Sequence, residues 1–91
     1  MAYGNVTAND VAKILVANNS KRQELTIVNY SSTTDVFLGP DSSVTSSNGI
    51  PLFSLQRNDR WKGPAGSYLG DIYIICASGQ TADIRYWEVE R

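Results

Sequence analysis

The chain has 91 residues, which is enough for one domain and too few for two, since domains usually run from roughly 50 to 200 residues. A hydrophobic content of 42% is that of an ordinary globular protein and argues against disorder. Eight basic and nine acidic residues are scattered along the chain. This distribution excludes the dense basic surface of a nucleic-acid-binding protein and the polybasic segment of a membrane-binding one.

The residues that catalysis and metal binding usually need are missing. Histidine is absent, so the common Ser-His-Asp and Cys-His arrangements cannot be built. A zinc site fails for the same reason and because Cys76 is the single cysteine. Cys76 lies in an apolar run, which predicts a buried, inert thiol. We expect no enzyme, no cofactor and no metal site.

Nothing in the chain predicts export or membrane insertion. The longest uninterrupted apolar stretch, residues 72–77, is far shorter than the roughly 20 residues of a membrane-spanning helix. The first residues lack the charged and apolar regions of a signal peptide. We therefore expect a protein that is made in a cytosol and binds neither membrane nor nucleic acid.

The N-terminal third contains the least regular pattern. Residues 1–9 have no apolar periodicity and are predicted to be an arm for a neighbouring subunit, with a single β domain over residues 10–91. Residues 9–15 fit either a short capped helix or a strand. Residues 23–30 are rich in β-branched side chains and end in a Ser/Thr cluster, which predicts a hairpin with a second strand at 35–38.

The rest of the chain alternates short apolar runs with turn residues. A polar run and Asn48-Gly49 lead into a short strand at 50–55, and 56–59 predicts a bend. The strongest strands are 71–77 and 82–89, joined at 78–81 by a predicted hairpin connection. Six to eight short strands predict an all-β fold, a compact antiparallel β-sandwich or barrel of jelly-roll-like type with little or no helix.

Aromatic side chains are the candidate interface residues. Trp61 stands between Arg60 and Lys62 before a Gly-Pro loop, with Tyr68 close behind, while Tyr3 belongs to the predicted arm. Trp61 fits the core and an interface equally well. Trp87 lies in a regular strand, which favours the core. The oxygen-rich run 41–49 has one Asp and no Glu, which favours a solvated turn over a calcium loop.

Four segments occur in an order that is found in one group of known proteins. They are KRQELTIVN at 21–29, VFLG at 36–39, SSVTSSNGIPL at 42–52 and ASGQTADIR at 77–85. In these segments the chain resembles small β-rich virion proteins of tailed bacteriophages, of the capsid decoration (cement) or head-fibre type. The resemblance favours a strand over a helix after residue 9.

The resemblance implies a function as well as a fold. It implies a non-enzymatic structural protein on the capsid surface of a virion, with the major capsid protein or other virion proteins as partner and with self-association, as trimers. The alternative is a carbohydrate- or host-surface-binding module of a tail or fibre, which would use Trp61, Tyr68 and the polar loops near them.

Overall fold

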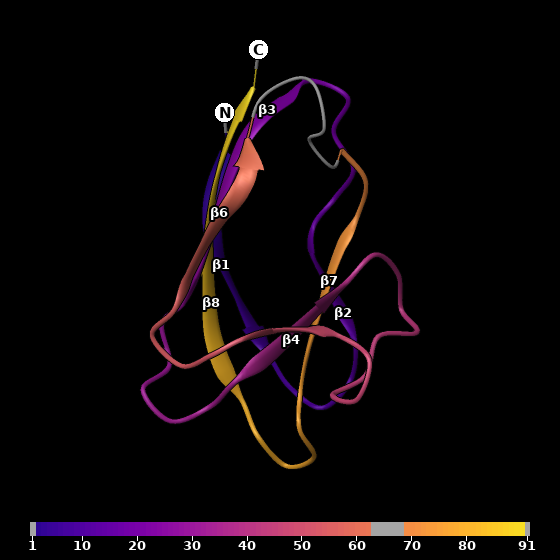
Figure 1. Ribbon diagram of the computed structural model, residues 1–91, viewed down its shortest axis with the longest axis vertical. Helices are drawn as coiled ribbons and strands as arrows, with labels where there is room; N and C mark the ends of the chain where they lie inside the picture. The colour runs from indigo at the N-terminus through magenta and orange to yellow at the C-terminus, as the bar shows by residue number, and fades with distance from the viewer. Residues whose placement is uncertain (1, 63–68, 91) are drawn as a thin grey trace.

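The computed structural model describes residues 2–62 and 69–90, and for residues 2 and 58–62 the backbone alone is described. Within these residues the chain forms eight strands and no helix (Figure 1). The strands are β1 (Ala2–Ala8), β2 (Lys13–Val16), β3 (Arg22–Asn29), β4 (Val36–Gly39), β5 (Ile50–Leu52), β6 (Arg57–Lys62), β7 (Ile72–Cys76) and β8 (Ala82–Glu90). The predicted all-β fold is confirmed, and the segment after residue 9 is a strand.

The strands form two antiparallel sheets that pack face to face. Sheet A has the order β1-β8-β3-β6 and sheet B the order β2-β7-β4-β5. Successive strands alternate between the sheets, except that β4 and β5 are neighbours in sheet B. Eight strands paired in this order form a jelly roll, in which two Greek keys close over one core. The predicted jelly-roll-like sandwich is therefore the observed architecture.

The core lies between the two sheets and is built by alternation along each strand. In β7 the side chains of Ile72, Ile74 and Cys76 point inward and are buried. In β8 the inward positions include Ala82 and Ile84. Because neighbouring residues of a strand point to opposite sides, the residues between them form the outer faces of the sheets.

Two predicted hairpins are wrong. The strand at 23–30 was expected to pair with the next one, but β3 lies in sheet A and β4 in sheet B. The connection between β7 and β8 also crosses between the sheets, although Gly79 has the positive φ expected of a turn, 78°. The first crossing is held by Asn29, which is buried and donates from Nδ2 to the carbonyl oxygens of Thr34 and Leu52.

The N-terminal segment also differs from expectation. Residues 1–9 were predicted to leave the body as an arm, but β1 pairs along its whole length with β8 of its own chain, from Ala2 opposite Glu88 to Ala8 opposite Ala82. Ala8 is buried in the core and Val6 packs against it. The segment lacks an alternating apolar pattern because, as an edge strand, it needs only these two apolar side chains on its inner face. Similarly, residues 57–59 belong to β6 and are not a bend.

Candidate functional site

Of the three aromatic residues that were predicted to form an interface, Tyr3 is the one whose side chain the structure describes. Tyr3 lies on β1 with 79% of its surface exposed. The backbone of Trp61 belongs to β6, opposite Leu25 of β3, and its side chain lies outside the described part of the chain. Tyr68 lies outside the described residues. Of the three, Tyr3 alone has a described position on the surface.

The partner of Tyr3 is a residue that was expected in the core. Trp87 of β8 is 56% exposed on the outer face of sheet A, directly opposite Tyr3 in the register. The two ring centroids are 6.4 Å apart and the rings are tilted by 47°. The alternation along β8 could have placed Trp87 on the outer face. Ile84 and Glu88 point inward, and Trp87 lies an odd number of residues from both, so its side chain points to the other side.

These two rings belong to a shallow groove on the outer face of sheet A. The groove has a volume of about 580 Å³ and crosses three neighbouring strands, β1, β8 and β3. Besides the aromatic pair, its lining includes Asn5, Glu24 and Arg85. One row across the sheet consists of Tyr3, Trp87 and Thr26, and the next consists of Asn5, Arg85 and Val28. The groove therefore combines exposed rings with hydrogen-bonding side chains.

The Arg85 side of the groove is held in place by contacts within the sheet. The guanidinium of Arg85 donates to the carboxylate of Asp83 at 3.1 and 3.3 Å and lies over the ring of Tyr30, 4.0 Å from its centroid. The Asn5 side-chain amide donates to the same carboxylate at 3.3 Å. A cation over an aromatic face and a bifurcated ion pair restrict the rotamers of Arg85. This end of the groove is thus preorganised.

The Trp87 side of the groove has uncommitted polar groups. Within the described residues, no hydrogen bond or ion pair involves the side chains of Glu24, Thr26 or Trp87. These groups are a carboxylate that only accepts, a hydroxyl that does both, and an indole N–H that only donates. All three groups line the groove that contains the two exposed rings.

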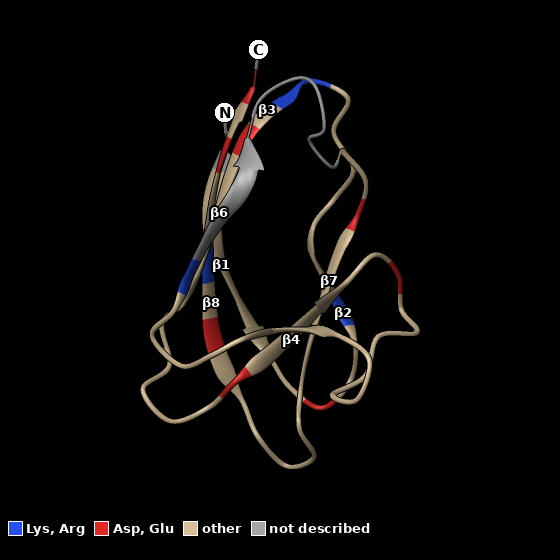
Figure 2. Ribbon diagram, viewed as in Figure 1, with Lys and Arg blue, Asp and Glu red and all other residues tan. Residues whose placement is uncertain are grey.

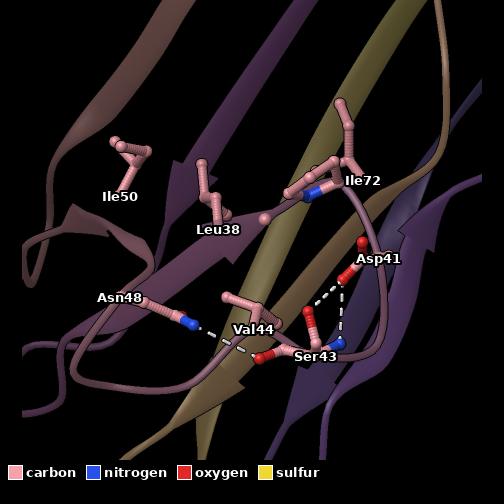
Figure 3. Close-up of a pocket in the computed structure, with 9 residues that line it drawn as sticks. Leu38, Asp41, Ser43, Val44, Asn48, Ile50 and Ile72 are labelled. Carbon is pink, nitrogen blue, oxygen red and sulfur yellow. Dashed lines mark hydrogen bonds between the residues drawn. The ribbon is translucent and has the colours of Figure 1, made fainter.

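A second pocket, of about 410 Å³, lies at the edge of sheet B, under the polar loop 40–49 (Figure 3). Its floor is apolar and includes Leu38, Val44 and Ile72. Val44 is the buried anchor of the loop, since a Cβ atom placed on Gly39 would lie 2.6 Å from its Cβ atom. The VFLG and SSVTSSNGIPL segments are therefore explained by packing, because glycine leaves the space that Val44 fills.

The polar groups around this second pocket are already used by the loop itself. The Asp41 carboxylate accepts hydrogen bonds from the backbone N–H of Ser43, at 2.9 Å, and from its hydroxyl. These bonds hold the pKa of Asp41 below its usual value. Asn48 accepts from the N–H of Thr45 at 2.7 Å and donates to the carbonyl of Ser43 at 3.4 Å (Figure 3). The loop is a self-satisfied turn, as the sequence favoured, and it offers little to a ligand.

The outward side chains of the sheet B strands are apolar, and the loop 40–49 lies against part of this face, over Phe37 and Gly39. The face consists of the outward side chains of four strands, namely Ile14, Phe37, Pro51, Tyr73 and Ile75. Ile14 is 42% exposed, while Phe37, Tyr73 and Ile75 are half-buried against their neighbours. Lys13 is the one charged residue within the bounds of these strands, whereas the strands of sheet A contain charged residues on three of four (Figure 2).

A buried ion pair clamps the two sheets at the end opposite the loop crossings of Asn29. Arg22 of β3 has no exposed surface, and its Nε donates to the Glu88 carboxylate of β8 at 2.6 Å. Its terminal nitrogens donate to the carbonyl oxygens of Ala17 and Gly70, at 2.8 and 3.2 Å. Ala17 follows β2 and Gly70 precedes β7, so the guanidinium joins sheet A to sheet B. This pair serves structure and stands apart from both outer faces.

The single cysteine lies at the inward C-terminal end of β7. Cys76 is buried, and burial together with the nearby Asp10 carboxylate raises the pKa of its thiol. In the part of the chain that is described, no cluster of three or more His, Cys, Asp or Glu side chains is placed to hold a metal ion. The same residues contain no helix long and apolar enough to cross a membrane. Comparisons with protein-family models, with curated proteins and with solved structures found no match.

Proposed function

We propose that the chain is a non-enzymatic structural protein of a phage virion, a decoration protein that is made in the host cytoplasm and binds the outside of the head shell. The observation that carries the proposal is the apolar outer face of sheet B, taken together with the four segments that resemble phage virion proteins. The major capsid protein is the proposed partner. Self-association as trimers completes the proposal and rests on the resemblance.

The side chains of this face support protein contact. The cores of protein interfaces are depleted in charged residues and enriched in aromatic ones. Phe37 and Tyr73 stand beside Ile14 and Ile75 on a surface without a charged side chain among its five members. Contiguous exposed apolar surface on a small soluble protein marks an interaction site. Exposed Phe53, at 53%, and Val11, at 66%, extend the apolar character around the margins of sheet B.

The size of the domain points in the same direction. A domain of about 60–100 residues buries only some 60–65% of its unfolded surface and is correspondingly marginal in stability. A partner that binds the folded form alone stabilises it by mass action. A virion subunit held against a shell gains this stabilisation permanently. The jelly-roll architecture is compatible with such a role, since viral capsid domains and lectins both use it, but the fold by itself assigns no function.

The test begins with particles of the phage whose genome encodes the chain. Mass spectrometry of purified virions should detect the chain at a copy number proportional to that of the major capsid protein. Particles made without the gene should bind the purified chain in a co-sedimentation assay, and electron cryomicroscopy should place it on the head. Virions that lack the chain would overturn the proposal.

The face itself is tested by a matched pair of variants. Ile14→Lys places a charge on the outer face of sheet B at an exposed position, and Thr7→Lys places the same charge on an exposed position of β1 in sheet A. Ile14→Lys should weaken particle binding by roughly 30-fold or more, the effect of losing an interface hot spot of about 2 kcal/mol. Thr7→Lys should leave binding within about twofold. Equal binding by both variants would rule out sheet B as the contact.

A further inference from the structure

We infer that the groove on the outer face of sheet A is a binding site for a neutral carbohydrate chain, with Tyr3 and Trp87 as its stacking rings. The inference is independent of the proposed role on the virion, because it rests on the opposite sheet and on different residues. It also differs from the carbohydrate hypothesis drawn from the sequence, which relied on Trp61 and Tyr68.

Two aromatic rings are exposed on the regular strand surface of sheet A. Tyr3 and Trp87 expose 79% and 56% of their surfaces, and they face each other across one step of the β1–β8 register. Most of an aromatic side chain is apolar and is stabilised by leaving water, so two such rings left open on one row form an incomplete contact. The flat faces of sugar rings present C–H groups that pack against aromatic rings, which would cover both.

Hydrogen-bonding groups without a partner in the described residues lie beside the rings. Glu24 pairs in register with Val89 and lies next to the Thr26–Trp87 position in the groove. Its carboxylate can only accept hydrogen bonds, and no partner engages it within the described residues. Thr26 and the Trp87 indole add a hydroxyl and a donor. Sugar hydroxyls donate and accept, so they can satisfy all three groups at once.

The polar groups of the groove favour a sugar over a peptide as its ligand. Aromatic grooves also bind proline-rich peptides in the polyproline II conformation. Such a peptide presents mainly carbonyl oxygens, because proline has no N–H. Carbonyl oxygens cannot replace the donors that water supplies to the exposed Glu24 carboxylate, whereas sugar hydroxyls can. The surface therefore favours a ligand rich in hydroxyl donors.

The charged side chains of the groove favour a neutral ligand. Arg85, the basic side chain that lines the groove, is already held by the Asp83 carboxylate and by the Tyr30 ring. Glu24 adds a negative charge beside the rings, and no described side chain pairs with it. An acidic polysaccharide would be repelled by Glu24 and would find Arg85 occupied. A neutral oligosaccharide suffers neither cost, and the groove volume of about 580 Å³ is within the range of small-molecule sites.

The experiment is a nuclear magnetic resonance titration of the full chain with neutral hexasaccharides of β-linked glucose, mannose, galactose and N-acetylglucosamine. At least one of the four should shift the Trp87 indole resonance and the amides of Tyr3, Glu24 and Thr26 in a saturable way. Trp87→Ala should weaken that binding by at least about tenfold. Glu24→Gln should weaken it by roughly three- to tenfold, because an ionised acceptor is replaced by a neutral one.

The matched control is Phe53→Ala, which removes a ring of nearly equal exposure, 53%, at a site away from the groove. It should bind as the unmodified chain does, and amide spectra of all variants should show the same fold. The inference is overturned if none of the hexasaccharides shifts the groove resonances. It is also overturned if Trp87→Ala binds normally, or if a proline decamer shifts these residues and the sugars do not.

Discussion

The outer faces of the two sheets are built from similar strands and differ in what their side chains have left to bind. On sheet B the outward side chains of Phe37, Tyr73 and Ile75 are half-buried, and Phe37 lies against Gly49 of the loop 40–49. On sheet A the outward rings of Tyr3 and Trp87 stay open and are flanked by free polar groups. One sandwich thus has an apolar face suited to protein contact and a mixed face suited to a polar ligand.

This difference shows that exposure alone does not identify a binding surface. The loop pocket near Asp41 is also exposed and concave, but its polar atoms are bound to one another. The groove on sheet A is distinguished by acceptors and donors without partners in the described residues. The free energy that a ligand can gain comes from groups that the fold leaves unsatisfied, because pairs already made contribute nothing more.

Both outer faces exist only while the two sheets are packed together. Replacing Arg22, which joins the sheets, has the largest expected effect. Arg22→Ala leaves the buried Glu88 carboxylate without its cation and should lower the free energy of unfolding by about 3–5 kcal/mol. Urea unfolding followed by circular dichroism measures the change.

Two controls sharpen this prediction. Arg85→Ala breaks the exposed pair with Asp83 and should cost less than about 1 kcal/mol. A double variant, Arg22→Met with Glu88→Leu, removes both buried charges and should recover most of the loss. An Arg22→Ala cost as small as that of Arg85→Ala would show that the buried pair does not hold the sheets.

A smaller effect is expected when one methyl group is added at Gly49, which lies against sheet B, or at Gly4 of β1 in sheet A. A Cβ atom on Gly49 would lie 2.6 Å from the Cβ of Phe37 and 2.9 Å from Cγ2 of Val44, so Gly49→Ala should cost about 1–3 kcal/mol. On sheet A, a Cβ atom on Gly4 meets nothing closer than the Tyr86 hydroxyl at 3.4 Å. Gly4→Ala should therefore change stability by less than about 0.5 kcal/mol.

Thermal and urea unfolding of Gly49→Ala and Gly4→Ala measure the two changes in stability. The predicted order reflects the close packing of the loop on the outer face of sheet B, where the added methyl group would clash, and the ordinary contact distance that it would meet beside Tyr86 in sheet A. Equal costs would mean that the loop is not closely packed on sheet B.

The smallest expected effect concerns the two sides of β7. Cys76 points inward and its thiol pKa is raised by burial, so a thiol reagent should label it at least about tenfold more slowly than a cysteine placed outward at Ile75 in a Cys76→Ala background. Labelling rates at neutral pH measure this. Equal rates would contradict the alternation that defines the outer face.

The raised pKa also gives a direction for the pH dependence. A thiol whose pKa is higher in the folded state favours folding fully below its unfolded pKa of about 8.5, and this contribution is lost as the pH rises above that value. The Cys76→Ala variant should show a smaller loss of stability between neutral pH and pH 10 than the unmodified chain.

The sequence by itself determined the all-β class and most of the strands, but it placed an arm at β1 and a bend at residues 57–59. Alternation in 82–89 set Ile84 apart from Arg85 and Trp87, whereas 72–77 is apolar on both sides and left open which side faces the core. The same alternation placed Trp87 opposite to Ile84, although an aromatic residue in a regular strand suggested the core. These features follow from contacts between residues close along the chain, which the local sequence contains.

Only the tertiary structure decided which strands are neighbours. Ser/Thr and Gly residues look the same in a hairpin and in a crossing between sheets, and the crossing after β3 depends on Asn29 reaching the carbonyl of Leu52, 23 residues away. The pairing of β1 with β8 and the groove that it creates depend on contacts between the two ends of the chain. Such pairings are set by the closure of one shared core around buried groups such as Arg22, and no local pattern specifies that closure.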